Sequence, residues 1–350
     1  MDAVVLIASF VIILTGAELF TNSIEWFGRK LGLAEGAVGS VLAAVGTALP
    51  ETMIPIIAIL FATGEHSDGI GVGAVLGAPF MLATLAMFVT GSAVLVMARS
   101  RRENDIMRVD THVLAVDMRA FAVAYSTAIG AAFLPLEPVW PKWVIAGLLL
   151  VMYGWYVKGH FEADASTDLD DLAPLRFHRL DRQAHRADPH TPRLRVVNAQ
   201  VIGALGLIII GATAFVGAVE HLGETLGIDG VILALVIAPI ATELPEKFNS
   251  ILWVRQGKDT LAMGNITGAM VFQSTIPTAV ALLFAPAAWS ISGGGLVAFG
   301  SAGIGLLSSA CIFLPMARSG RLRGRGLLIG GLFYVIYLTF VITTLSQPAR

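Results

Sequence analysis

The stretch Gly46-Thr47-Ala48-Leu49-Pro50-Glu51 lies inside an apolar run that extends from about residue 36 to residue 61. Its proline has no N–H to donate and disrupts a helix one turn back. Its glutamate would be an ionised group at bilayer depth, which costs roughly 2.5–3.5 kcal/mol or more when unpaired. The second half of the chain repeats the pattern as Ala241-Thr242-Glu243-Leu244-Pro245-Glu246. We predict that these two stretches face each other and hold a cation.

The composition of the chain is that of a membrane protein. Of its 350 residues, 56% are hydrophobic and 14% are charged, and the single cysteine, Cys311, excludes a disulfide framework. Apolar runs of about 20 residues can span a bilayer, and only helices satisfy the backbone there. The sequence therefore predicts an all-α integral membrane protein with about ten transmembrane helices. Their expected ranges are 3–24, 36–62, 70–97, 114–134, 142–158, 197–219, 229–253, 260–286, 294–316 and 326–345.

The placement of Lys and Arg predicts the orientation, because cytosolic loops are enriched in both. With the N- and C-termini outside the plasma membrane, the cytosolic loops collect most basic residues, including Arg29, Lys30, Arg99, Arg108, Arg255, Lys258, Arg318 and Arg325. The outside loops hold acidic groups such as Glu65, Asp68, Glu220 and Glu224. Residues 159–196 are the long polar stretch of the chain and are predicted to form a cytosolic linker, with a short surface helix near residues 172–187.

An internal repeat relates the two halves. Residues 16–51 align with residues 211–246 without a gap, and the Thr-x-Leu-Pro-Glu pattern falls in register. The loop that is basic at Arg29-Lys30 corresponds to an acidic Glu224-Thr225, so the two loops should lie on opposite sides of the membrane. Five spans per half also invert the second copy. Inverted repeats are typical of secondary transporters, with the binding site near the midplane.

The repeat divides the chain into three parts. The first five-helix repeat is expected at 1–158, with its motif region at 36–97. The cytosolic linker follows at 159–196. The second five-helix repeat is expected at 197–350, with its motif region at 229–286.

The residue types of the two motifs favour a hard cation. Thr47 and Glu51, like Thr242 and Glu246, stand four positions apart and share a helix face. Hydroxyl, carbonyl and carboxylate oxygens suit Na⁺ or Ca²⁺, and Ca²⁺ takes about 6–8 of them. One span later, Gln273 could add its amide oxygen. The predicted metal-binding residues are Thr47, Glu51, Thr242, Glu243, Glu246 and Gln273, although Lys247, four positions after Glu243, is placed to neutralise it.

Several other polar or small residues have simpler interpretations. The Gly-x-x-x-Gly spacings at Gly73/Gly77 and Gly264/Gly268 are more often helix packing than a site. Glu18 is expected to pair with Arg29 or Lys30. Asp117 and Arg119 are expected at a helix entrance, and His178, His185 and His190 are expected in a solvated loop because their spacing is irregular for a metal.

At these residues the chain resembles the sodium/calcium exchanger (cation/Ca²⁺ antiporter) superfamily, as a divergent prokaryotic-type member. That family carries a Gly-Thr-Ser-Leu-Pro-Glu motif followed by a Gly-Asn-x-x-Gly-Ser-Asn-x-x-Asn-like motif in each repeat. Residues 46–51 and 241–246 match the first motif, and residues 264–268 match the start of the second. The resemblance implies ten helices, an inverted repeat and alternating access. It also implies that Glu51 and Glu246 are the central ion-coordinating carboxylates, with Thr47 and Thr242 beside them.

The chain departs from the family pattern in both halves. The motif serine is Ala48 in the first copy and Glu243 in the second. The second element of the first copy has Ala78, Pro79 and Leu82 where the family has polar residues. With fewer polar side chains, the exchanged ions and their stoichiometry cannot be carried over from the family.

The functional prediction is a secondary active antiporter that exchanges Ca²⁺ or a similar cation against Na⁺ or H⁺. Two alternatives remain: a non-transporting or ion-sensing relative, and a cation channel that shares the fold. No enzyme motif is present, so no enzymatic activity and no cofactor are expected. The expected partners are the lipid bilayer and small inorganic cations, with no nucleic acid.

Overall fold

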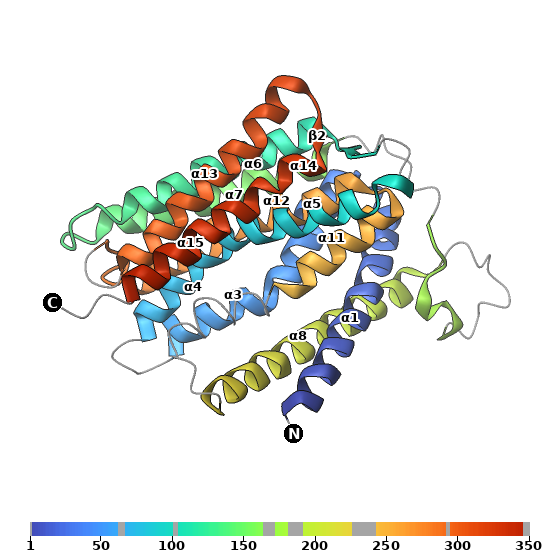
Figure 1. The fold of residues 1–350 in the computed structure, drawn as a ribbon, viewed down its shortest axis with the longest axis horizontal. Coiled ribbons are helices and arrows are strands. Elements are labelled where there is room, and N and C mark those ends of the chain that lie inside the picture. Colours follow the sequence, from blue (N-terminus) through green and yellow to red (C-terminus); the bar gives the residue numbers. More distant parts are fainter. Residues whose placement is uncertain are drawn as a thin grey trace. The chain divides into compact units, whose positions relative to one another are not determined.

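A computed structural model of the chain describes residues 2–61, 67–100, 104–163, 172–180, 192–225, 243–291 and 295–345. Thr242, most of the predicted span at 229–253, and His185 and His190 of the linker lie outside these residues. The chain divides into two compact units (Figure 1). Unit 1 comprises residues 1–50 and 157–265, and unit 2 comprises residues 51–156 and 266–350. Each unit takes elements from both halves of the sequence.

Unit 1 is built around two long helices, α1 (Asp2–Leu31) and α8 (Leu194–Thr225). They lie side by side in Figure 1, in blue and yellow-green, and form the most extensive helix pair of the unit. α2 (Glu35–Ala37), a π-helical turn (Val38–Ala43) and the start of α3 (Ala44–Phe61) follow α1. α11 (Leu244–Gln256) packs against α1 and ends at Gly257, whose left-handed backbone (φ 76°) caps the helix.

The α1–α8 contact has a reciprocal geometry. A Cβ added to Gly16 would lie 3.0 Å from Cγ1 of Ile208, and one added to Gly211 would lie 2.9 Å from Cγ1 of Ile13. Gly16 and Gly211 are partners in the sequence repeat, and Ile13 and Ile208 each stand three positions before them. Each glycine therefore receives the isoleucine of the other helix, which is the arrangement that a two-fold relation produces.

Unit 2 contains the remaining helices. These are α4 (Ser67–Met81), the π-helical turn Leu82–Ala86, α5 (Met87–Val96), α6 (Thr111–Ala131), most of α7 (Trp140–Glu162) and of α12 (Asp259–Phe284), α13 (Gly295–Ser319), α14 (Gly324–Leu327) and α15 (Ile329–Leu345). Asp110 begins α6 by accepting hydrogen bonds from the backbone N–H groups of His112 (2.8 Å) and Val113 (3.2 Å). α13 packs against α4, α6 and α15.

Eight described helices are long and apolar enough to cross a membrane. The predicted spans at 36–62 and 229–253 are not among them. The first is nevertheless one continuous helical run, from Glu35 of α2 through the π-helical turn to Phe61 of α3, and most of the second lies outside the described residues. Within the described residues, the all-α prediction holds apart from one short antiparallel pair in unit 2, β1 (Ile106–Met107) with β2 (Leu322–Arg323). The chain is thus a helical multi-pass membrane protein.

The linker residues 172–180, here called the strap, pack against unit 1. It contains a 3₁₀ turn (Arg176–Leu180) where the sequence predicted a longer surface helix, and residues 181–191 lie outside the described residues. Leu175 is buried with Trp26 of α1 and Val197 of α8. This segment is therefore packed on two helices, α1 and α8.

Candidate cation site

The carboxylates of the second Thr-x-Leu-Pro-Glu motif lie at the start of α11. Glu243 is the residue before the helix, Pro245 stands in its first turn, and Glu246 follows within that turn. Proline suits this position because its missing N–H would have no helical partner. The aligned peptide dipoles make a helix N-terminus partially positive, which favours carboxylates there. Both glutamates are buried, with exposures of 1% and 0%.

Lys247 is paired with Glu243. The Lys247 Nζ donates to Oε2 of Glu243 at 2.8 Å, and both side chains are almost fully buried. The sequence spacing indicated this pair, and the structure confirms it. The positive partner of Glu243 is therefore the ammonium group of Lys247.

Glu246 is the second buried carboxyl group at the start of α11. Both of its carboxylate oxygens are buried and have no hydrogen-bond partner among the described residues. Its backbone oxygen accepts from Nδ2 of Asn265 at 3.4 Å, and Oδ1 of Asn265 accepts from the Thr47 hydroxyl at 3.2 Å. Thr47 and Asn265 are both fully buried. A buried anion without a donor is costly, so this carboxylate suits a bound cation.

Asn249 is a polar residue of the same helix that the sequence reasoning missed. It follows Glu246 by three positions, which places both on one face of α11. Its side chain is fully buried, and neither amide atom has a hydrogen-bond partner among the described residues. The available signal was an asparagine one turn after the motif glutamate, where the first half has Ile54. Its amide oxygen is a further candidate cation ligand.

In unit 2, Gln273 of α12 donates from Nε2 to Oε1 of Glu51. Both side chains are buried, with exposures of 1% and 7%. Oε1 of Gln273 has no partner among the described residues, so an acceptor oxygen remains beside the carboxylate. The structure thus joins two of the predicted site residues in this unit, whereas Thr47, Glu243 and Glu246 belong to unit 1.

The available ligand atoms are those of a hard cation. Within the described ranges, no cluster of three or more His, Cys, Asp or Glu side chains could hold a metal ion. The donors are instead glutamate, threonine, asparagine and glutamine oxygens, which suit Na⁺ and Ca²⁺ better than transition metals.

Asp117 does not lie at a helix entrance, and that prediction was wrong. It is fully buried within α6, and its carboxylate accepts from the Tyr156 hydroxyl at 2.9 Å and from the Thr267 hydroxyl at 2.5 Å. The sequence could not indicate these partners because they come from distant helices. Arg119, two positions later, is exposed.

The prediction for Glu18 was also wrong. It pairs with Arg176 of the strap at 2.8 Å, because α1 continues unbroken to Leu31. A straight helix rises about 1.5 Å per residue, which carries Arg29 about 16 Å along the axis from Glu18.

The glycine spacings also differ between the halves. A Cβ on Gly264 would lie 2.9 Å from Oγ of Ser40, so this glycine allows close packing within unit 1. For Gly73 and Gly77, no described atom lies within 4 Å of an added Cβ. The packing interpretation therefore holds at Gly264 and fails at Gly73 and Gly77 for the described atoms.

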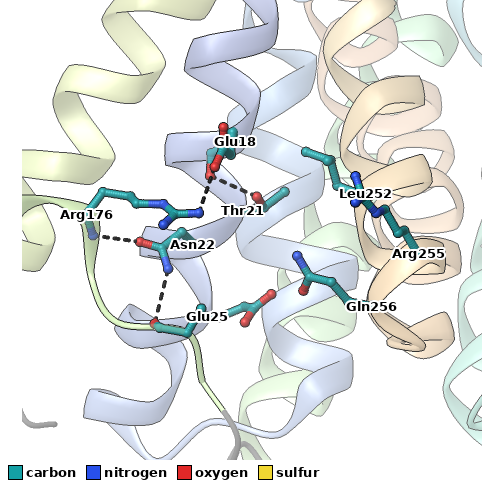
Figure 2. Close-up of a pocket in the computed structure, with 9 residues that line it drawn as sticks. Glu18, Thr21, Asn22, Glu25, Arg176, Leu252, Arg255 and Gln256 are labelled. Atoms are coloured by element: carbon teal, nitrogen blue, oxygen red, sulfur yellow. Dashed lines mark hydrogen bonds and ion pairs between the residues drawn. The ribbon is translucent and has the colours of Figure 1, made fainter.

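A separate pocket of about 450 Å³ opens in unit 1 between α1, the strap and α11 (Figure 2). It is lined by Glu18, Thr21, Asn22, Glu25, Ala173, Arg176, Leu252, Arg255 and Gln256. Its carboxylates already have partners: Arg176 pairs with Glu18, and Glu25 accepts from Trp253 at 2.8 Å and also pairs with Lys258. None of the predicted cation ligands lines this pocket.

The long apolar helices place the chain among the polytopic membrane proteins. The family model described as sodium/calcium exchanger protein matches residues 1–159 and 198–345, and the chain belongs to that family. The resemblance seen in the sequence motifs is thereby confirmed.

Individual relatives are similar over most of their length. The sodium/calcium exchanger MaX1 of Methanosarcina acetivorans is 23% identical over 81% of this chain and 83% of its own. The putative antiporter CaxA of Alkalimonas amylolytica is 22% identical over 91% of this chain and 90% of its own. A solved structure of the sodium-calcium exchanger NCX_Mj superposes with a TM-score of 0.70 at 15% identity and covers 97% of both chains. At that identity, the structural likeness establishes the fold.

Proposed function

We propose that the protein is a secondary active antiporter that exchanges Ca²⁺ or a similar cation against Na⁺ or H⁺ by alternating access. The observation that carries the proposal is the Glu246 carboxylate, which is fully buried, lies in the first turn of α11, and has no hydrogen-bond partner among the described residues. A transported cation would supply the missing positive charge. Family membership supports the same class of activity.

The proposed cation ligands are oxygen donors from both halves of the chain. Thr47 and Glu246 act within unit 1, and Glu51 with Gln273 within unit 2. Thr242 is included because it stands four positions before Glu246, as Thr47 does before Glu51. No resident cofactor is needed, since the cations are the cargo.

We further propose ten transmembrane helices arranged as two inverted five-helix repeats in the plasma membrane, with both termini outside. The reciprocal packing of Gly16 with Ile208 and of Gly211 with Ile13 supports the repeat, because the shift that takes Gly16 to Gly211 also takes Ile13 to Ile208 and so relates one contact to the other. The excess of Lys and Arg in the expected cytosolic loops supports the orientation.

The proposal is tested by ion flux into proteoliposomes. Uptake of radiolabelled Ca²⁺ is measured first with an imposed Na⁺ gradient and then with an imposed pH gradient, which identifies the counter-ion. The Glu51→Gln, Glu246→Gln double variant is expected to reduce exchange to the level of empty liposomes. The control is Glu162→Gln, at an exposed glutamate of α7, which is expected to retain exchange.

Three outcomes would point elsewhere. Unchanged exchange in the double variant would contradict the site assignment. Flux that needs no counter-ion would indicate a channel. Cation binding without flux would indicate an ion-sensing relative, an alternative motivated by the apolar second element of the first repeat, where Pro79 and Leu82 are buried.

A further inference from the structure

The start of α11 holds two buried carboxyl groups and one buried amine. Glu243, Glu246 and Lys247 are all at least 96% buried. The lysine ammonium has three donors and no acceptor, and it lies 2.8 Å from Glu243. One carboxylate is therefore neutralised within the chain, and Glu246 is left without a hydrogen-bond partner in the described residues.

The Glu243–Lys247 pair occurs in the second copy of the motif and has no counterpart in the first. At the positions that correspond to Glu243 and Lys247, the first half has Ala48 and Thr52, and neither carries a charge. An extra carboxylate alone would raise the number of cations that the second half can hold. The lysine arrives four residues later on the same helix face and cancels that gain.

We propose that the Lys247 ammonium acts as a tethered monovalent cation, which occupies the place beside Glu243 that a free Na⁺ would otherwise take. A primary ammonium at hydrogen-bonding distance presents one positive charge to the carboxylate, as a bound Na⁺ would. Lys247 therefore limits the second half to one transported cation, bound at Glu246. The second part of this inference rests on the proposed function, whereas the occupancy beside Glu243 does not.

An ion pair that only stabilises the helix and a tethered cation differ in whether a free ion binds once the lysine is mutated. Removing one member of a buried pair leaves an uncompensated charge and is strongly destabilising, whereas removing both members is often close to neutral. If Lys247 occupies a cation position, Na⁺ can enter once the ammonium is gone, and its binding will stabilise the folded state by mass action. If the pair serves only to hold the helix, no ion will replace it.

The experiment measures the melting temperature of the purified protein in detergent at fixed pH while Na⁺ replaces choline at constant ionic strength. Lys247→Gln is expected to melt well below wild type in choline and to gain a saturable rise of several degrees with Na⁺. Glu243→Gln, Lys247→Gln is expected to melt close to wild type and to show no added Na⁺ response. Lys247→Arg keeps the fixed charge and is expected to show no added response.

The matched control is Lys258→Gln, which breaks the pair of Lys258 with the buried Glu25 in the same unit. It is expected to lower the melting temperature without recovery in Na⁺. Equal recovery in Lys258→Gln, or none in Lys247→Gln, would overturn the inference. Because Lys247→Gln is prepared in high Na⁺, failure of Na⁺ to support a folded protein would overturn it as well.

Measurements of ion flux then test the tethered cation separately from the antiporter proposal. In Lys247→Gln proteoliposomes, the Hill coefficient for Na⁺ is expected to rise by about one. A wild-type protein that neither binds nor exchanges cations would refute the antiporter proposal, while Na⁺ recovery of Lys247→Gln would still support the tethered cation. Wild-type exchange without that recovery would refute the tethered cation alone.

Discussion

Gln273 donates a hydrogen bond from its amide nitrogen to the carboxylate of Glu51, although 222 positions separate the two residues in the sequence. Both are buried in unit 2, where α12 brings the amide against α3. The bond orients the carboxylate and leaves the Gln273 carbonyl oxygen as an unpartnered acceptor among the described residues. One side chain therefore both positions the glutamate and keeps an acceptor oxygen beside it.

Replacing Gln273 by leucine is expected to lower the apparent affinity of the protein for Ca²⁺. A hydrogen bond to a charged group contributes about 1.5–3 kcal/mol, so the Ca²⁺ concentration for half-maximal exchange should rise about tenfold or more. The measurement is the Ca²⁺ dependence of flux in proteoliposomes. The control is Gln256→Leu at an exposed position of α11, where no change is expected. An unchanged half-maximal concentration in Gln273→Leu would exclude this role.

Local patterns in the sequence predicted the local features of the structure. Apolar runs located the helices, and the spacing of Glu243 and Lys247 indicated their ion pair. Partners that depend on tertiary packing were not accessible in this way, because no periodicity relates Glu18 to Arg176 or Asp117 to Thr267. Asn249 was missed for a related reason, since an asparagine in an apolar helix becomes informative only when its burial is known.

Asp117 is expected to stabilise unit 2 through the two hydroxyl groups that it accepts from. Asp117→Leu should lower the free energy of unfolding by about 3 kcal/mol, because it removes two hydrogen bonds to a charged acceptor. Asp117→Asn keeps an acceptor oxygen and should cost about 1 kcal/mol. Thermal melting in detergent tests this order, with the exposed Glu162→Gln as the control. Equal losses in the two Asp117 variants would contradict the hydrogen-bond account.

The strap is expected to depend on Gln200 rather than on the Glu18–Arg176 pair. Gln200 is fully buried; its Oε1 accepts from the Phe177 N–H at 2.8 Å, and its Nε2 donates to the Leu19 carbonyl at 2.9 Å. The Gln200→Leu variant should raise hydrogen exchange in residues 172–180 by about tenfold or more, since it loses these two bonds and a third, from Nε2 to Oδ1 of Asn22 at 2.9 Å. Arg176→Ala removes a half-exposed pair and should change stability by less than about 1 kcal/mol. The reverse order would show that the ion pair holds the strap.

The reciprocal α1–α8 contact predicts matched effects at two positions far apart in the sequence. Gly211→Ala and Gly16→Ala each place a Cβ about as close to an isoleucine of the other helix as real contacts allow, so both should destabilise the protein by about 1–3 kcal/mol. Removing the facing Cγ1, with Ile13→Ala for Gly211→Ala and Ile208→Ala for Gly16→Ala, should relieve part of each close contact, so each pair should lose less stability than the sum of its single variants.

Gly206→Ala is the control for both, because no described atom lies within 4 Å of a Cβ at that position of α8, and its melting temperature should not fall. Melting curves of the single and paired variants measure each coupling energy as a double-mutant cycle. If one glycine tolerates alanine and the other does not, the contact is not reciprocal, and the packing support for an inverted repeat is lost. Similar coupling energies for the two glycine–isoleucine pairs would mean that α1 and α8 pack through two equivalent contacts.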